Sequence, residues 1–320
     1  FEYIFYTPEI HSDLFQKYEP DLVVVTALCG FEYNEYFARE ALKNNKPLII
    51  PGAVNAYSAK LAQKAGHKAL YLSGSGVAAA SYGLPDLGVT SMEDVLIDAK
   101  RITSATSLPL LVDIDTGWGD SKSICKAIKE FSKAGCAAVH IEDQVFDKRC
   151  GHRPNKQIVS ISEMRDRLKV ALDSKIDNSF FIMARTDALA SEGMNGAIER
   201  CGEYLDEGAD GIFLEAVTSI DQYQEFKNNF SVPLLANITE FGKTPLFTQA
   251  ELNAVGVGMV LYPLTAFRAM SQSAENVYNS VIKDGTQEPL LDIMQTREEL
   301  YEVLDYYNFE KELDDKLSKE

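Results

Sequence analysis

A cysteine stands among cationic and titratable side chains in the run Lys148-Arg149-Cys150-Gly151-His152. Neighbouring positive charge favours the thiolate, so this thiol is expected to ionise more easily and to react more readily than one in an apolar core. Cys150 is therefore a candidate for chemistry. The alternative is a surface loop that carries an incidental thiol, and the rest of the sequence has to decide between the two.

Carboxylates follow several short apolar runs of the chain. Asp113 and Asp115 close one run, and the alternation of side chains along a strand places both on the same face. Glu142 and Glu215 close two further runs. Gathered in one place, these carboxylates would repel one another unless a cation lay between them. Mg²⁺ or Mn²⁺ prefers such hard oxygen ligands, so the sequence predicts a divalent metal site.

The elements that position these residues are eight short apolar runs, each rich in branched or aromatic residues and each ending in polar ones. They cover residues 48–52, 69–73, 108–115, 137–143, 180–187, 211–215, 233–239 and 257–263. Runs this short and this continuously apolar are typical of strands buried on both faces, and the stretches between them are long enough for a helix each.

The intervening stretches carry the signals of helix ends. Capping-box spacing occurs in three pairs, Thr90 with Glu93, Ser160 with Glu163 and Thr248 with Glu251. Glycines suited to a left-handed helix end stand just before the next strand, at Gly66, Gly135, Gly208 and Gly256. The repeated unit is therefore helix, glycine, strand.

Eight such units predict a TIM-type (β/α)8 barrel over residues 46–285, with an open doubly wound sheet as the alternative. Residues 1–45 form an N-terminal extension of uncertain structure. Residues 286–320 are expected to be helical from Met294 onward, with an apolar stripe at Leu300, Val303, Leu304 and Tyr307. Because a TIM barrel carries its active site at the carboxyl ends of the strands, the polar residues found there are expected to converge.

Composition restricts the function classes. The chain has 320 residues, 46% of them hydrophobic, which allows a sizeable core. The formal net charge of -17 would repel nucleic acid and anionic membranes, and no apolar run approaches membrane-spanning length. Five cysteines form no CxxC pair, which argues against structural zinc or a disulfide framework and predicts a reducing, cytoplasmic location.

Two local patterns have competing interpretations. Residues 74–79 match the GxGxxA form of a dinucleotide fingerprint, with Glu93 near the distance of a ribose-binding acid. Glu93 fits a helix cap better, so the glycine loop is expected instead to offer backbone amides to a carboxylate. His140 lies inside the fourth predicted strand, where a histidine with satisfied hydrogen bonds is expected rather than a metal ligand.

Three segments carry a family resemblance: KRCGHRPNK at residues 148–156, DID at 113–115 and NITEFG at 237–242. They resemble the 2-methylisocitrate lyase branch of the isocitrate lyase and phosphoenolpyruvate mutase superfamily, from about residue 46 to the C-terminus. The cysteine motif separates the lyases from the mutases and phosphonate hydrolases, and the chain lacks the large insertions of true isocitrate lyases. The loop Ser73-Gly74-Ser75-Gly76 departs from many relatives, which have a glycine in place of Ser75.

The resemblance implies retro-Claisen cleavage of a tricarboxylate, (2S,3R)-2-methylisocitrate, to pyruvate and succinate in the methylcitrate cycle of propionate catabolism. It places Mg²⁺ with Asp113 and Asp115, with Glu142 in support without binding the metal directly, so that the alkoxide of the substrate is stabilised. Cys150 would protonate the succinate carbanion.

The resemblance also implies roles for the remaining positions. Lys148 and His152 would set the protonation state and orientation of the thiol, and Asp86 matches a further catalytic position. Arginines are suited to clamping carboxylates. The positions expected to bind the substrate are Ser73, Gly74, Ser75, Gly151, Arg185, Glu215, Asn237, Ile238, Thr239, Arg268 and Arg297.

Other readings stay open. In the family the C-terminal helix packs against a neighbouring subunit of a homotetramer, and the alternative is packing on its own barrel. An isocitrate lyase or another lyase of the same superfamily, acting on oxaloacetate or a related 2-oxo or 2-hydroxy acid, is the alternative activity. A catalytically silent barrel that serves as a scaffold is an alternative of a different class.

Overall fold

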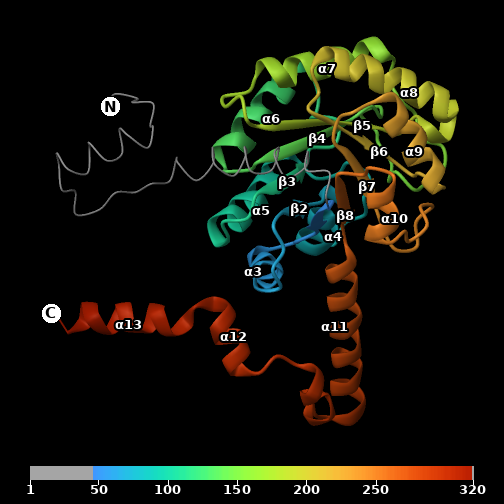
Figure 1. The fold of residues 1–320 in the computed structure, drawn as a ribbon. Coiled ribbons are helices and arrows are strands. Elements are labelled where there is room, and N and C mark those ends of the chain that lie inside the picture. The colour runs from blue at the N-terminus through green and yellow to red at the C-terminus, as the bar shows by residue number, and fades with distance from the viewer. Residues whose placement is uncertain (1–45, 319–320) are drawn as a thin grey trace, which may run out of the picture.

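The computed structural model describes residues 46–318 (Figure 1). The expected N-terminal extension, residues 1–45, lies outside the described residues. Eight parallel strands form one sheet. They are β1 (Leu48–Pro51), β2 (Leu70–Leu72), β3 (Leu110–Asp113), β4 (Ala138–Glu142), β5 (Phe181–Thr186), β6 (Gly211–Leu214), β7 (Leu234–Asn237) and β8 (Met259–Tyr262). Each lies inside its predicted range.

The sheet curls into a nearly closed barrel. Its strand order is β1-β8-β7-β6-β5-β4-β3-β2, so the first strand pairs with the last. The seam between β1 and β2 is joined by a parallel bridge of Gly52 with Tyr71 and by a 2.9 Å hydrogen bond from the Ala53 amide to the Tyr71 carbonyl. The TIM-type (β/α)8 fold is therefore confirmed, and the open doubly wound alternative is wrong.

Helices alternate with the strands and surround them. They are α3 (Ala56–Lys64), α4 (Gly74–Tyr82), α5 (Met92–Ala105), α6 (Ser121–Lys133), α7 (Ile161–Asp173), α8 (Leu189–Glu207), α9 (Ile220–Asn229), α10 (Gln249–Ala254) and α11 (Thr265–Asp284). Two apolar layers result from the alternation of strand side chains. Residues such as Ile50, Met183 and Leu261 fill the barrel, and residues such as Leu70, Val112 and Ile182 pack between sheet and helices.

The helix ends mostly follow the predicted signals. Thr248 and Glu251 form the capping box of α10, and the side chain of Ser160 caps α7. The four predicted glycines all have positive φ, as left-handed helix ends require. The cap of α5 was predicted one residue too early, because Ser91 and Asp94 form the capping box instead of Thr90 and Glu93.

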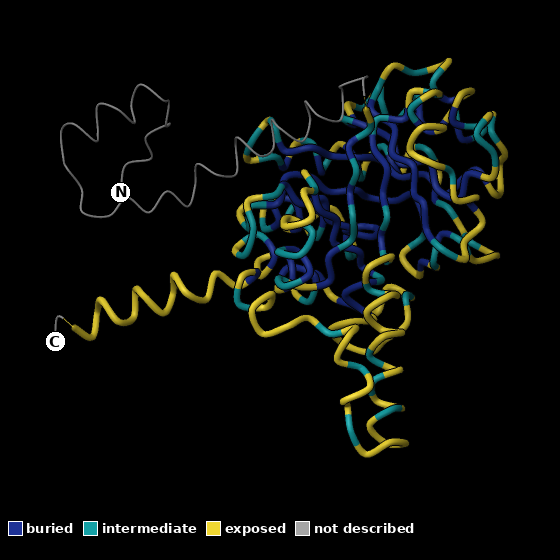
Figure 2. Tube along the Cα trace, turned by 60° about the horizontal axis from the view of Figure 1, so that its bottom comes forward, coloured by how far each residue is buried: buried dark blue, intermediate teal, exposed yellow. Residues whose placement is uncertain are grey.

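The C-terminal part of the chain leaves the barrel. Helix α11 projects away from it (Figure 1), and none of its 20 residues is buried, so exposed residues dominate this arm and the end of the chain (Figure 2). A short 3-10 helix (Glu288–Ile293) then leads to α12 (Arg297–Leu304) and α13 (Tyr306–Leu317). The prediction of one helix is wrong, because Asp305 takes a left-handed backbone with φ of 58° and separates two helices. Helix α12 packs against α3 of the same chain.

Candidate active site

The loop between β4 and α7 carries the cysteine motif and lies over the carboxyl ends of the strands. Its Lys148 reaches into the barrel mouth, where the side-chain nitrogen Nζ lies 2.8 Å from an oxygen of Asp86 and 2.5 Å from Oδ1 of Asp115. Lys148 is buried although it is charged. A buried ammonium requires carboxylate partners, so this pairing fixes the loop to the rim where the acidic residues gather.

Asp113 and Asp115 face the same space at the start of α4. The amide of Gly74 donates to Asp113 Oδ2 at 3.1 Å, and the amide of Asp115 donates to Asp113 Oδ1 at 3.0 Å. The strand ends at Asp113, and Asp115 has a left-handed φ of 47° instead of the predicted strand conformation. The two carboxylates therefore meet through a turn that returns Asp115 to the rim, not through alternation along one strand.

Burial and charge act in opposition on this pair. Burial alone would raise the pKa of Asp113, but His140 in its protonated form, at low pH, and the charges of Lys148 and Arg185 lower it to about 2. Burial raises the pKa of Asp115 to about 6, although Lys148 opposes the rise. Asp113 therefore carries the firmer negative charge of the two.

Beneath the carboxylates lie two aromatic residues that close the floor of the site. His140 is fully buried on β4, as predicted, and its Nε2 lies 2.9 Å from the hydroxyl of Tyr71. The expectation of satisfied hydrogen bonds is wrong at Nδ1, which is buried without a partner among the described residues. The Tyr71 hydroxyl also donates to Asp113 Oδ2 at 3.4 Å. Burial lowers the pKa of His140 to about 4, so the ring is neutral near pH 7. The floor adds polarity without adding charge.

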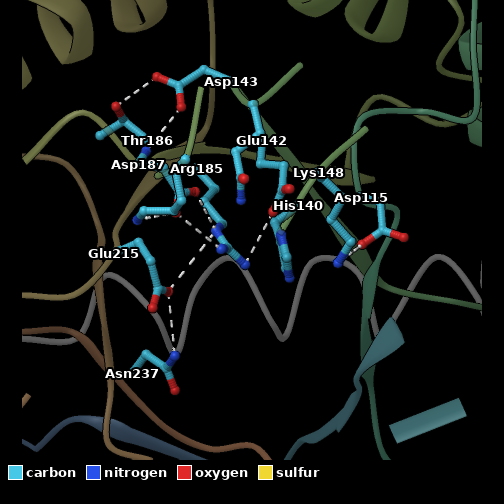
Figure 3. A network of polar contacts seen from close by, with 12 residues as sticks. Asp115, His140, Glu142, Asp143, Lys148, Arg185, Thr186, Asp187, Glu215 and Asn237 are labelled. Atoms are coloured by element: carbon cyan, nitrogen blue, oxygen red, sulfur yellow. Dashed lines mark hydrogen bonds and ion pairs between the residues drawn. The ribbon is translucent and has the colours of Figure 1, made fainter. Parts of the chain in front are cut away.

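Arg185 lies at the centre of a set of buried carboxylates (Figure 3). Its guanidinium contacts Asp187 at 2.9 Å and Glu142 at 3.1 Å, and its Nε lies 3.9 Å from Glu215. It also lies over the ring of Phe213, 5.1 Å from the centroid. A guanidinium has more donors than these contacts use, so Arg185 can bind a further carboxylate in the mouth.

Gly151 brings the cysteine loop into direct contact with that centre. A Cβ at this position would lie 2.6 Å from a guanidinium nitrogen of Arg185 and 2.6 Å from Cγ of Glu215. Only a glycine lets the loop backbone settle so closely on these side chains. The loop therefore places Cys150, its neighbour, at the same rim as Asp113 and Asp115.

Cys150 does not have the easily ionised thiol that its neighbours in the sequence suggest. Burial raises its pKa, and a hydrogen bond with the His152 backbone only partly opposes this. The prediction of a more acidic thiol is wrong because burial of the thiol outweighs the nearby positive charge, and Lys148 is paired with carboxylates. The thiol is protonated at neutral pH, which suits a proton donor better than a nucleophile.

A second polar layer supports the site from behind and was not predicted. Asp187 accepts from Arg185 and also from Lys156 at 2.6 Å, so it ties the far end of the cysteine loop to the barrel. Asp143 accepts from Thr186 at 2.6 Å and from Tyr204 at 2.9 Å. A sequence signal existed for the position of both carboxylates, since each is the last residue of a predicted strand, but their contacts had no such signal.

The remaining predicted residues divide into two groups. Asn237 donates to Glu215 at 3.3 Å, so it belongs to the cluster, and the backbone at Ile238 and Thr239 continues along the rim. Ser73 and Ser75 flank Gly74 at the beginning of α4. Two arginines stand apart from the buried cluster. Arg268 is exposed on α11 beside Glu240, and Arg297 is exposed at the first turn of α12.

The glycine loop supplies no dinucleotide fingerprint. Its residues form the first turns of α4, and the Gly74 amide donates to a carboxylate of the chain itself. Glu93 lies in the first turn of α5 and pairs with Lys126 at 2.7 Å on the surface. One backbone amide of this loop does donate to a carboxylate, that of Asp113, and binding of a substrate carboxylate by the loop stays a prediction.

The carboxylates fit a magnesium ion that is shared with a substrate. Asp113 Oδ2 and Asp115 Oδ1 each lie 3.3 Å from the point where a Cβ of Gly74 would stand, so the glycine leaves both oxygens open to one space. Asp115 Oδ1 is buried, and its partner among the described residues is the ammonium of Lys148 at 2.5 Å. Within residues 46–318 no three His, Cys, Asp or Glu side chains form a complete metal site. Mg²⁺ typically takes one or two carboxylates and fills its other positions with water and substrate, so two suffice.

Comparison with known proteins gives the family. Residues 38–282 match the family described as phosphoenolpyruvate phosphomutase. The chain is 59% identical to 2-methylisocitrate lyase of Shewanella oneidensis, over 88% of this chain and 97% of the relative. The identity to 2-methylisocitrate lyase of Escherichia coli is 56%, over 86% and 94%. The chain belongs to the 2-methylisocitrate lyase family.

Solved structures place this family within a wider group. A 2,3-dimethylmalate lyase, a member of the PEP mutase/isocitrate lyase superfamily, is 32% identical with a TM-score of 0.81, covering 87% of this chain and 93% of that one. An oxaloacetate acetylhydrolase is 30% identical with a TM-score of 0.81, covering 89% and 97%. A phosphonopyruvate hydrolase in complex with oxalate and Mg²⁺ is 28% identical with a TM-score of 0.77, covering 87% and 97%.

Proposed function

We propose that this chain cleaves (2S,3R)-2-methylisocitrate to pyruvate and succinate in the methylcitrate cycle of propionate catabolism. The observation that carries the proposal is the seating of the cysteine loop. Lys148 pairs with Asp115, and Gly151 lies against Arg185 and Glu215, so one rim combines a protonated thiol, an anionic pair and a cation that binds carboxylates. These are the groups that cleavage of a hydroxy tricarboxylate requires.

The reaction has one step that the thiol of Cys150 can serve. The substrate hydroxyl loses its proton, a carbonyl forms, and the electron pair of the broken carbon–carbon bond passes to the succinate fragment. That fragment must then gain a proton at carbon. Cys150 donates it, with Lys148 and His152 orienting the thiol and Asp86 holding Lys148 at 2.8 Å.

Arg185 holds a substrate carboxylate at the centre of the site through charge-assisted hydrogen bonds. The backbone of Gly74 and the side chains of Ser73 and Ser75 line one end of the site. The other end is lined by Glu215, Asn237, Ile238 and Thr239. Arg268 and Arg297 are further candidates for carboxylate binding, at positions outside the buried cluster.

A divalent cation completes the proposal. Asp113 and Asp115 would hold Mg²⁺, or Mn²⁺ in its place, and Glu142 would support them from behind. When bound, the cation would stabilise the alkoxide that develops on the substrate hydroxyl. The phosphonopyruvate hydrolase solved with Mg²⁺ supports this assignment by its likeness to the chain.

Removal of the metal is expected to abolish activity. In EDTA, pyruvate release should fall to background, and added Mg²⁺ should restore it, because the two carboxylates alone would repel the anionic substrate. A coupled assay for pyruvate measures the effect, and calorimetry of Mg²⁺ binding to an Asp113→Ala variant identifies the ligand. Full activity in chelator would remove the metal from the proposal.

Substrate preference tests the activity itself. 2-Methylisocitrate should be cleaved much faster than isocitrate, because a site shaped for the methyl group gains about 1–3 kcal/mol from filling it. The coupled assay run with both substrates at equal concentration measures the ratio. Comparable rates would favour a general isocitrate lyase, and no pyruvate from either would favour a silent scaffold or another substrate of the superfamily.

We further propose that the chain forms a homotetramer through its C-terminal helices. Apolar side chains are exposed on two C-terminal helices, Tyr278 at 69% and Ile282 at 84% on α11 and Phe309 at 66% on α13. A long helix without buried residues needs a partner surface to be stable. Light scattering of the purified chain measures the assembly.

No helix within residues 46–318 is long and apolar enough to span a membrane. A thiol that must stay reduced fits the proposed cytoplasmic location.

A further inference from the structure

His152 joins three loops of the barrel mouth. Its ring belongs to the cysteine loop, and its Nε2 lies 2.9 Å from Oε1 of Glu215, which follows β6. On the other side of the ring, Nδ1 accepts a hydrogen bond of 3.0 Å from the backbone amide of Lys243, in the loop between β7 and α10. A ring nitrogen that accepts carries no proton, so the single proton of the neutral ring lies on Nε2, towards Glu215.

Gly242 is the residue that lets the ring reach that amide. A Cβ at this position would lie 2.8 Å from Nδ1 of His152, 3.0 Å from its Cε1 and 2.9 Å from Cγ2 of Thr239. Gly242 does not have a left-handed backbone, so a side chain here would act by displacing the His152 ring or Thr239 and not through φ. This position is therefore open to a purely steric test.

Phe241, the residue before Gly242, has a backbone conformation that the surrounding structure of the β7–α10 loop must hold in place. Phe241 has a left-handed φ of 61°, which is unfavourable for an aromatic residue, while its side chain is 94% exposed. The guanidinium of Arg268 lies 5.7 Å from the Phe241 ring. An exposed side chain gains little from packing within the chain, so the strained backbone serves the position of the residues that follow.

We propose that the hydrogen bond from the Lys243 amide to the His152 ring, which the absence of a side chain at Gly242 permits, holds the cysteine loop closed. This contact is called the catch below. Gly242 is thus a positioning residue for the proposed lyase reaction and acts only through His152. With the catch engaged, Cys150 is held at the rim and partly shielded from solvent. With the catch lost, the loop opens and the thiol is both misplaced and exposed. The role in turnover rests on the proposed function, and the shielding of the thiol does not.

Gly242→Ala tests the catch through two readouts. Alkylation of Cys150 by iodoacetamide, followed on the peptide that contains it, should become severalfold faster than in the wild type. Turnover should fall by about a hundredfold, as expected for a reacting group displaced by about an ångström. Gly202→Ala is the matched control. Gly202 lies inside α8, and a Cβ there would come no closer than 3.7 Å to its nearest neighbour, Phe230. Both readouts should be unchanged in this control.

Variants of His152 separate the catch from a general structural effect. In His152→Asn the amide oxygen can replace Nδ1 as the acceptor, so Cys150 should stay protected, whereas His152→Ala should expose it. Adding Gly242→Ala to His152→Ala should cause no further increase in alkylation, because both changes remove the same contact. Wild-type alkylation in a folded Gly242→Ala protein, or additive effects in the double variant, would overturn the proposal.

The outcomes also separate the two proposals. If the wild type releases no pyruvate from 2-methylisocitrate, the proposed function fails, and the alkylation rates still decide whether the catch exists. If Gly242→Ala does not fold, the comparison of His152→Asn with His152→Ala decides it, and equal exposure of Cys150 in those two variants would count against the catch.

Discussion

Cys150→Ser is expected to lower kcat by about a hundred- to ten-thousandfold while the fold and Mg²⁺ binding are kept, because general acid catalysis by a positioned group contributes on that order. The hydroxyl has nearly the shape of the thiol but is far too weak an acid to protonate the succinate fragment. KM should change little, since carboxylate binding depends on other side chains such as Arg185. The coupled pyruvate assay gives both constants.

Cys125→Ser is the matched control for this change. Cys125 is also a half-buried free cysteine, but it lies on α6 and outside the cluster at the barrel mouth. Its replacement should leave kcat at the wild-type value. An equal loss of turnover in both serine variants would mean that general damage to the fold, and not a missing proton donor, explains the effect.

Arg185→Met is expected to abolish activity and to destabilise the fold by about 3–5 kcal/mol at neutral pH, because removing one partner of a buried ion pair leaves the other charge uncompensated. Three carboxylates contact this guanidinium, and all are almost completely buried. Urea unfolding measures the free-energy difference. Arg165→Met is the control, because that arginine pairs with Glu203 and Glu207 at a solvent-exposed position, where loss of an ion pair has little effect.

The destabilisation of Arg185→Met should depend on pH with a defined sign. Burial alone would raise the pKa of Glu215, but Arg185 and His152 hold it below the ordinary value. A lowered folded-state pKa contributes stability above the unfolded value, near pH 4.3, which is lost as the pH falls through the folded pKa. Without Arg185, burial dominates, and an ionised Glu215 destabilises the folded state. The difference in the free energy of unfolding between the variant and the wild type should therefore be largest at neutral pH and should narrow towards pH 4. A constant difference from pH 7 to pH 4 would contradict this origin.

The barrel could be predicted from the sequence because its strands are buried on both faces and therefore appear as continuous apolar runs. The helix ends that carry glycine could be predicted equally well, since a left-handed φ suits that residue above all others. The residue that caps α5 could not be predicted, because Thr90 and Ser91 have similar side chains and only the geometry shows which of them caps the helix. The break at Asp305 left no Gly or Pro signal, so the two C-terminal helices were predicted as one.

The site was predicted in its composition but not in its electrostatics. Neighbours in the sequence suggested an acidic thiol at Cys150, yet Lys148 turns away to pair with Asp115 and burial raises the pKa of the thiol. Long-range pairing of this kind has no sequence pattern. The same holds for Asp187, whose contacts with Arg185 and Lys156 join two loops, and for the amide of Lys243, since any residue other than proline carries such a donor.

The central claim is that a protonated thiol and a carboxylate pair act on one substrate at one rim of the barrel. The most direct test is kcat of Cys150→Ser at saturating 2-methylisocitrate and Mg²⁺, measured beside the wild type and Cys125→Ser. We expect a loss of at least about a hundredfold in Cys150→Ser alone. A kcat of Cys150→Ser close to that of the wild type would contradict it.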